Sequence, residues 1–293
     1  MSGGRRWLTA TLMALGAVTV GLLGGCGTSR GARSFSITAS TAGPARTAPA
    51  GRSVADPRHA RSRAVTGTRA PSRVAVIVME NTEYGDVIGS PAAPFLNALA
   101  SRYASVRNMF AVTHPSLPNY LALTGGSTFG ISSDCTACNV GATSIVDQLE
   151  QTRISWRAYM EDLPYPCFTG ASAGEYAKKH DPFVYYTRVA DNRSWCRRVV
   201  PLTTLSADER ARTLPRFIWI SPNLCHDMHD CPIATGDRFL SSLVPPLLRS
   251  LGPHGVLFIT WDEGASNAGC CRLASGGHIA TIAAGPEAKR VLG

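Results

Sequence analysis

Three apolar runs in this chain are continuous rather than alternating, and each one stops at a polar residue. They span residues 73–79, 216–221 and 255–261 and are rich in Val, Ile and aromatic side chains. Such runs are typical of strands buried on both faces of a parallel sheet. Segments with a helical period of apolar residues, 94–103 and 237–251, lie between them. The pattern predicts an α/β fold, with a mostly parallel central sheet flanked by helices.

The polar residues that follow these runs predict a ligand site. Glu80 and Asn81 follow the first run, Asn223 follows the second, and Asp262 and Glu263 follow the third. The carboxyl ends of parallel strands meet at one edge of the sheet, where open α/β proteins bind ligands. Adjacent carboxylates repel each other unless a cation or a proton lies between them. We therefore favour a metal or phosphate site over a solvent-exposed turn.

A serine lies at a similar junction. Ser116 follows a strand-like run over 106–112 and begins a short helical pattern that ends at Gly125-Gly126. A hydroxyl at a helix N-terminus faces unpaired N–H groups, which can bind a phosphate. Serine is also a favoured helix cap, so the local sequence leaves a nucleophile and a cap equally open. The convergence of polar strand ends on the same edge favours the nucleophile.

The segment after residues 216–221 is dense in possible ligands and acid–base groups. Two cysteines bracket five of them, and a purely structural role for all five is not expected. They are Asn223, His226, Asp227, His229 and Asp230.

Residues 161–200 hold several Pro and aromatic residues, two Cys and mixed charge, and they predict an insertion that lies over the site rather than in the core. Its cluster Lys178-Lys179-His180 could contact an anionic substrate. Such clusters are more often a solvent-exposed face, and this is the interpretation that we favour.

The N-terminus has the features of an export signal: Arg5-Arg6, an apolar run over 7–23, and small residues before Cys26. It resembles a bacterial lipoprotein signal, so we expect residues 1–25 to be a signal peptide and Cys26 to be lipidated. The expected location is outside the cell, anchored to the membrane, or secreted if Cys26 is not lipidated.

The net charge of +9 is concentrated before the predicted domain. Residues 27–70 hold eight Arg and one Asp, whereas residues 71–293 hold 19 basic and 19 acidic side chains. A nucleic-acid-binding domain would carry its positive charge on the folded surface, so we exclude nucleic acid as a partner. Residues 26–70 contain too few large apolar groups to fold and predict a disordered basic tether, whose arginines can contact anionic lipids.

Eight further cysteines follow Cys26, and an even number in an exported chain predicts up to four disulfides. The sequence alone does not assign them. Short loops are plausible for two pairs, a longer loop for a third, and the last two cysteines pair with each other or elsewhere. These pairs are Cys135–Cys138, Cys225–Cys231, Cys167–Cys196 and Cys270–Cys271. Zinc at Cys135-x-x-Cys138 is a less favoured alternative, because no second CxxC follows at ribbon spacing.

Four motifs, in this order, resemble those of a known family. They are Glu80-Asn81, His114-Pro-Ser-x-Pro-Asn-Tyr120, Ser221-Pro-Asn with Asp227-Met-His229, and Thr260-Trp-Asp-Glu-Gly264. From residue 73 to residue 285, the chain resembles the bacterial phosphoesterases of the acid phosphatase and non-specific phospholipase C type, within the alkaline phosphatase superfamily. The resemblance implies an alkaline-phosphatase-like sandwich. It also implies hydrolysis of phosphoric esters, carried by a small molecule or a phospholipid headgroup.

The resemblance implies a metal-assisted mechanism. A divalent metal would be held against Ser116, which attacks phosphorus and forms a phosphoserine that water then hydrolyses. The implied ligands are Glu80, Asn81, Asp262 and Glu263. This oxygen-rich set suits Mg²⁺, Ca²⁺ or Mn²⁺ better than Zn²⁺.

The resemblance also implies two further groups of residues. His226 or His229 would protonate the leaving oxygen. Asn223, Asp227 and His278 would form a second metal or phosphate site, although Asn223 stands where the family has Asp and Asp227 where it has His.

Three alternatives stay open at this point. Related proteins continue into a further His-bearing segment, whereas this chain stops at Gly293, so we expect a C-terminus that is reduced or truncated. The protein could therefore be a ligand-binding lipoprotein or a degenerate phosphoesterase without activity. The pattern Gly170-Ala-Ser172-Ala-Gly174 matches a serine esterase elbow, but no buried strand precedes it.

Overall fold

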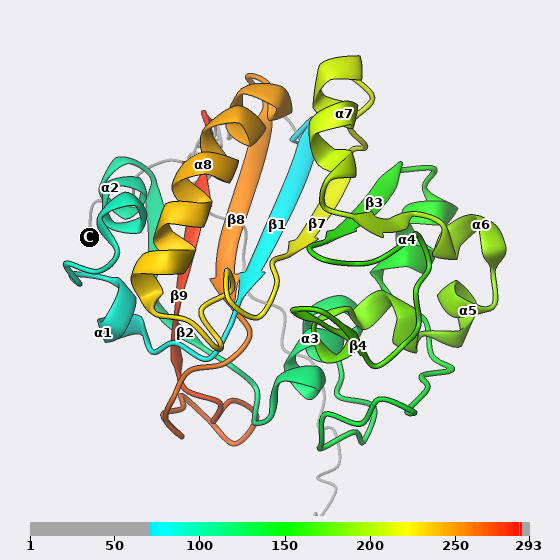
Figure 1. Cartoon of the computed structure of the whole chain (residues 1–293). Helices are drawn as coiled ribbons and strands as arrows, with labels where there is room; N and C mark the ends of the chain where they lie inside the picture. Colours follow the sequence, from blue (N-terminus) through cyan, green and yellow to red (C-terminus); the bar gives the residue numbers. More distant parts are fainter. Residues whose placement is uncertain (1–70, 287, 289–293) are drawn as a thin grey trace, which may run out of the picture. The chain divides into compact units, whose positions relative to one another are not determined.

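A seven-stranded sheet forms the centre of the computed structural model, which describes residues 71–286 and residue 288. The spatial order of the strands is β2-β9-β8-β1-β7-β3-β6 (Figure 1). The predicted signal peptide, Cys26 and the predicted tether lie outside the described residues. The strands are β1 (Arg73–Met79), β2 (Ala104–Phe110), β3 (Trp156–Met160), β6 (Val199–Pro201), β7 (Phe217–Ser221), β8 (Gly255–Trp261) and β9 (His278–Ala284).

The sheet is mostly parallel, as predicted. Strand β1 pairs in parallel with β7 and β8, and β3 pairs in parallel with β7 and β6. Strand β9 runs antiparallel to both β8 and β2. The three strands with polar ends, β8, β1 and β7, are therefore direct neighbours, and their carboxyl ends meet at one edge. Ile77, Val78 and Met79 are fully buried, which explains the continuous apolar run before Glu80.

Helices cover both faces of the sheet, which makes the sandwich that the resemblance implied. On one face α2 (Pro94–Arg102), α7 (Thr204–Ala211) and α8 (Ile233–Leu251) pack against β1, β7 and β8, and α8 passes in front of β9 and β8 in Figure 1. On the other face lie α3 (Ser116–Gly125), α4 (Ile145–Gln151) and the segment from Tyr176 to Val189. Of the helices in the described part of the chain, none is long and apolar enough to cross a membrane.

Helix α8 begins at Ile233, four residues before its predicted start at Asp237. Asp237 lies within α8, and its side chain binds the N-terminus of α2. Its carboxylate accepts hydrogen bonds from the backbone N–H groups of Phe95 at 3.1 Å and Leu96 at 2.9 Å. These are N-terminal donors of α2, whose own N-cap is Ala93 without a side-chain bond. A contact between residues distant in the sequence thus supplies the missing cap.

The segment 161–200 contributes to the core, so its interpretation as a covering insertion outside the core was wrong. Phe183, Tyr185, Tyr186 and Val189 are fully buried. They pack against α3 and β7 in the core cluster of the second face. The segment consists of short elements that hide the usual periodicity. These are β4 (Ser172–Ala173), β5 (Tyr176–Ala177), the 3₁₀ turns Lys178–His180 and Pro182–Tyr185, α5 (Thr187–Ala190) and α6 (Arg193–Cys196). The remaining short helix, α1 (Tyr84–Val87), follows β1 and is not part of this segment.

Three of the four expected disulfides are present among the described residues: Cys135–Cys138, Cys167–Cys196 and Cys225–Cys231. The zinc alternative for the first pair is excluded, because both sulfurs are bonded to each other. Cys270 and Cys271 are exposed free thiols.

Asp208 of α7 ties this helix to strand β3. Its Oδ2 accepts hydrogen bonds from Arg157 and, at 2.7 Å, from the Tyr159 hydroxyl. Burial raises the pKa of Asp208, but these hydrogen bonds and the Arg157 charge outweigh it, so the pKa is lowered. We expect Asp208→Asn to lower the free energy of unfolding at pH 7 by about 1–3 kcal/mol, measured by urea denaturation.

The contribution of Asp208 has a defined pH dependence. A lowered pKa in the folded state stabilises the protein above the unfolded pKa and is lost as the pH falls through the folded pKa. The wild type and Asp208→Asn should therefore converge in stability as the pH falls from about 5 toward 2. A difference that stayed constant over this range would contradict the assignment.

Candidate active site

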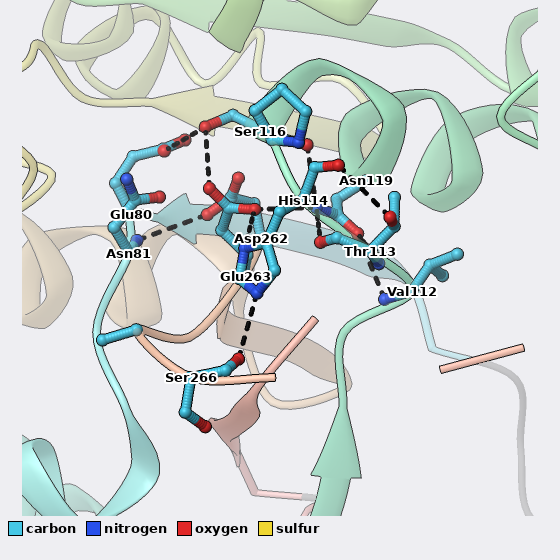
Figure 2. A network of polar contacts seen from close by, with 12 residues as sticks. Glu80, Asn81, Val112, Thr113, His114, Ser116, Asn119, Asp262, Glu263 and Ser266 are labelled. Carbon is cyan, nitrogen blue, oxygen red and sulfur yellow. Dashed lines mark hydrogen bonds and ion pairs between the residues drawn. The ribbon is translucent and has the colours of Figure 1, made fainter. Parts of the chain in front are cut away.

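Ser116 lies beside the carboxylates that follow β1 and β8. Its Oγ donates a hydrogen bond to Glu80 Oε2 at 3.0 Å and lies 3.5 Å from Glu263 Oε1 (Figure 2). Only 1% of the Ser116 surface is exposed. The structure thus brings together the residues that the sequence placed at three separate positions along the chain.

The helix does not use the Ser116 hydroxyl as a cap, so the cap interpretation is wrong. Pro115 occupies the N-cap position of α3, and Ser116 is the first helical residue. The donors of the first turn are met in other ways: Leu117 N–H donates to Asp134 Oδ1 at 2.9 Å. Asn119 fixes the approaching chain, since its Oδ1 accepts from the N–H of Thr113 at 3.0 Å (Figure 2). The hydroxyl of Ser116 therefore remains available for chemistry.

Asn81 directs its amide between two carboxylates. Its φ of 44° lies in the left-handed region, which turns the chain sharply after β1. One end of the amide lies 3.2 Å from Glu80 Oε2 and 3.0 Å from Glu263 Oε1. With nitrogen at that end, the amide donates to both carboxylates. With oxygen there, three oxygens converge on one point, which is favourable only around a cation.

The donor set fits a divalent cation. Asp262 is 2% exposed, and its Oδ2 has no hydrogen-bond partner among the described residues. Burial is the main cause that raises the pKa of Glu80, and the negative charges of Asp262 and Asp227 raise it further. Burial also raises the pKa of Asp262, and the negative charge of Glu263 adds to this effect. Leaving such oxygens ionised and unpaired in the interior is costly. A hard cation that prefers oxygen ligands would satisfy them.

Two residues hold the loop after Asp262 and Glu263 in place. His114 bridges Glu263 and this loop, because its Nδ1 lies 2.7 Å from Glu263 Oε2 and its Nε2 lies 3.0 Å from Ser266 O (Figure 2). Glu83 binds the same loop. Its carboxylate accepts hydrogen bonds from Ser266 Oγ and from the N–H groups of Ala265, Ser266 and His278. Burial raises the pKa of Glu83, but these bonds outweigh it and the pKa is lowered.

His180 is a site residue that the sequence interpretation missed. Lys178 and His180 are 7% and 4% exposed, so the prediction of a solvent-exposed face was wrong for both. His180 Nε2 lies 3.3 Å from Glu80 Oε2, and Nδ1 lies 3.1 Å from Asp227 Oδ2, although neither contact is aligned as a hydrogen bond. Burial lowers the pKa of His180 well below its usual value, followed by the charge of Lys179. No local signal distinguishes this histidine from an exposed one.

A positive group and a second histidine adjoin His180. Ligand atoms of Glu80, His180 and His229 all lie within 4.8 Å of one another. Lys179 Nζ lies 3.1 Å from His229 Nε2 and 3.3 Å from Asp134 Oδ2. A lysine here can offset the negative charge of a phosphate ester.

Three of the candidate residues have other partners. His226 pairs with Glu161 Oε1 at 2.9 Å and stacks on Phe239 of α8. Asn223 binds its own loop and Asp162 Oδ2. His278 contacts Arg107 O at 2.6 Å and stacks between Tyr84 and Phe110. Sequence order could not separate these residues from Asp227 and His229.

The structure does not bring the three residues of the expected second site together. Of Asn223, Asp227 and His278, only Asp227 lies beside the central cluster, where its Oδ2 faces His180. Burial raises the pKa of Asp227 to about 7. The esterase alternative is also corrected, because Ser172 is an exposed residue of a two-residue strand, β4, rather than part of a strand-to-helix elbow.

A substitution of Tyr120 tests whether its hydrogen bond to Glu80 helps to position that carboxylate. Its hydroxyl donates to Glu80 Oε1 in the buried interior. Tyr120→Phe removes the donor and leaves that oxygen unpaired, so we expect kcat to fall by about tenfold. Tyr185→Phe is the matched control, because the buried Tyr185 hydroxyl has no hydrogen-bond partner within residues 71–286. Equal kinetics for the two variants would argue against a role for Tyr120.

The family model described as the Phosphoesterase family matches residues 89–266, more than half of the chain. The chain belongs to the phosphoesterase family. The matched range includes Ser116, Asp262 and Glu263 and begins after Glu80 and Asn81. The resemblance noted from the four motifs is thereby confirmed.

Among curated proteins, this chain is 36% identical over 194 residues to phosphatidylinositol-3-phosphatase of Mycobacterium tuberculosis. The match covers 66% of this chain and 63% of the relative. It is 33% identical over 195 residues to an acid phosphatase of Aspergillus fumigatus. That match covers 63% of this chain and 43% of the relative. The chain thus spans less than two thirds of the length of these relatives.

Among solved structures, the fold is similar to a protein of the alkaline phosphatase superfamily from Vibrio parahaemolyticus, with a TM-score of 0.50 and 15% identity. The match covers 75% of this chain and 61% of that chain. The predicted fold class is confirmed by this likeness and by the sheet.

Proposed function

We propose that this phosphoesterase hydrolyses phosphoric esters by way of a covalent phosphoserine at Ser116. The observation that carries the proposal is the position of the Ser116 hydroxyl, which is buried, not used as a cap, and 3.0 Å from Glu80 Oε2. Relatives named as phosphatases support the reaction class.

Ser116 attacks phosphorus as the oxygen–phosphorus bond to the leaving group breaks, and its proton passes toward Glu80. Glu80, Asn81, Asp262 and Glu263 would hold a divalent cation, with Mg²⁺, Ca²⁺ or Mn²⁺ suited to these oxygens. When bound, the cation lowers the pKa of the hydroxyl and neutralises phosphate charge. Asn119 binds the backbone of the segment before Ser116, and His114 contacts Glu263, so both residues help to keep Ser116 and Glu263 in place during the transfer.

We assign protonation of the leaving oxygen to His229 rather than His226. His229 lies beside Glu80 and His180, and its side chain is 25% exposed, so a leaving group can reach it. Both histidines have partners, since His226 contacts Glu161 and Phe239 and His229 contacts Asp230 and Lys179, but only His229 lies in the cluster with Glu80. His180 lies between Asp227 and Glu80, and burial lowers its pKa. Water then cleaves the phosphoserine, with His229 as the base.

The proposed substrates are phosphate esters outside the cytoplasm, either small molecules or phospholipid headgroups. Disulfides and the signal-like N-terminus support export, and Cys26 would anchor the protein to the membrane. The named relatives, a phosphatidylinositol-3-phosphatase and an acid phosphatase, support both substrate classes.

The experiment is an assay of the purified full chain with p-nitrophenyl phosphate and bis-p-nitrophenyl phosphate, with and without EDTA. Turnover that EDTA abolishes and Mn²⁺, Mg²⁺ or Ca²⁺ restores supports the proposal, and the preferred ester separates phosphatase from phosphodiesterase. Turnover that EDTA leaves unchanged would contradict the cation. No turnover with any cation, together with phosphate binding, would favour a non-catalytic binding protein.

A further inference from the structure

Cys270 and Cys271 are neighbours in the loop that joins β8 to β9. All six other cysteines in the described part of the chain are in disulfides. Both remaining thiols are exposed, and Cys270 Sγ donates a hydrogen bond to Cys271 Sγ at 3.3 Å. The pair is thus accessible and preassembled, whereas the other cysteines within residues 71–286 have been oxidised.

We propose that Cys270 and Cys271 form a redox-active dithiol, a modification site that reacts with disulfides and closes reversibly into a vicinal disulfide. Exposure gives a reactant access to the thiols, and the short separation lets the second thiol resolve the intermediate of the first. Adjacent Cα atoms lie about 3.8 Å apart, shorter than the usual range for disulfides, so the closed pair would be strained and easily reduced.

The two thiols have different parts in the reaction. The pKa of Cys271 is lowered, mainly by a hydrogen bond from the Leu273 N–H and next by the hydrogen bond from the Cys270 thiol. The pKa of Cys270 is raised, mainly because its thiol is the donor in the hydrogen bond to Cys271. The thiolate of Cys271 attacks a disulfide R–S–S–R, forms a mixed disulfide and releases one thiolate RS⁻. Cys270 loses its proton to solvent and attacks Cys271 Sγ, which releases the second RS⁻. The two cysteines lose two electrons, and the reactant becomes two thiols.

The loop that carries the pair is tied to the approach to Ser116. Ser275 N–H donates to Val112 O at 3.1 Å, and Gly276 N–H donates to Ala111 O at 2.9 Å. Next to the pair, Ala274 N–H donates to Cys271 O at 3.3 Å and closes a turn. This turn carries Arg272 and Leu273.

The turn forms one wall of a cavity of about 590 Å³ beside α3. The opposite walls come from the segment before Ser116, from α3 and from the loop after it, and include Val112, Thr113, Ala122, Gly126, Thr128 and Ile131. Closing the disulfide fixes the dihedral angles of Cys270 and Cys271 and therefore changes how the turn holds Arg272 and Leu273. The redox state of the pair would set the shape of this cavity.

The first test equilibrates the full chain with glutathione disulfide, alkylates it with iodoacetamide under denaturing conditions, and maps the peptides by mass spectrometry. In the wild type we expect a Cys270–Cys271 link, with neither glutathione nor an alkyl group on either residue. Cys270→Ser and Cys271→Ser should each retain one glutathione, because no second thiol resolves it. A wild type that keeps glutathione, stays alkylated at both cysteines, or forms a disulfide-linked dimer would overturn the proposal.

The second test measures the turn itself by limited digestion with trypsin, which cleaves after Arg272. Oxidation should slow this cleavage by about threefold or more in the wild type and leave the rate unchanged in the double variant Cys270→Ser, Cys271→Ser, which has no thiol in this turn. Equal rates for oxidised and reduced wild type would overturn the effect on the turn. Neither test uses turnover, so failure here is distinct from failure of the proposed phosphoesterase activity.

Discussion

Ser116→Ala is expected to lower kcat for phosphate ester hydrolysis by about 10⁴-fold or more, without unfolding the protein. The substitution removes the Ser116 hydroxyl, whose Oγ lies 3.0 Å from Glu80 Oε2 and 3.5 Å from Glu263 Oε1. No other serine hydroxyl is placed to replace it among the carboxylates of the described site. The helix keeps its N-terminus, because Asp134 binds the Leu117 N–H and Pro115 is the cap.

The matched control is Ser172→Ala, which removes the serine of the esterase-like pattern. Ser172 is an exposed residue of strand β4, so its loss should leave kcat and KM unchanged. Steady-state kinetics and a urea denaturation curve for each variant separate chemistry from folding. Turnover that survives Ser116→Ala would refute the proposed nucleophile. Loss of turnover only in Ser172→Ala would instead support the esterase.

Removing the divalent cation is the change with the second-largest expected effect. We expect chelation to lower kcat by at least about 10³-fold, because neutralisation of the phosphate charge is lost. We also expect it to lower Tm at pH 7.5 by about 5–10 °C, since a ligand that binds only the folded state stabilises it. The stability arm needs no substrate and tests the site independently of activity.

The cation-free protein should lose stability as the pH rises. Burial raises the pKa of Asp227 to about 7, against about 3.9 in an unfolded chain, and the pKa values of Glu80 and Asp262 are raised as well. Between these values the folded state binds more protons than the unfolded state, so the free energy of unfolding falls with increasing pH. The decrease in Tm on chelation should therefore be smaller at pH 5 than at pH 7.5.

Two variants sharpen this test. Asp262→Asn removes one proposed ligand charge and should weaken the response of Tm to Mn²⁺. Asp208→Asn removes a carboxylate that binds Arg157 and Tyr159, away from the proposed ligands, and should keep the full response. A Tm that does not respond to chelation at pH 7.5 would refute a cation site formed by Glu80, Asn81, Asp262 and Glu263.

Local sequence was sufficient to predict the sheet and its polar edge. The continuous apolar runs before Glu80 and Asp262 correctly indicated neighbouring parallel strands, because burial on both faces leaves no room for alternation. Three cysteine pairings judged plausible from loop length are present in the structure. The short elements of 161–200 were misjudged, because single turns bury aromatic residues without a readable period.

The sequence by itself determined the fold class, the strands β1, β7 and β8 with their polar ends, and the position of Ser116 at a helix start. Only the tertiary structure decided which polar groups meet: His180 joins Glu80, whereas His226 and His278 bind elsewhere. It also decided that Asp134, rather than Ser116, binds the first turn of α3. The physical reason is that strand and helix signals arise from near neighbours in the chain, while a site is assembled from loops whose mutual positions depend on long-range packing.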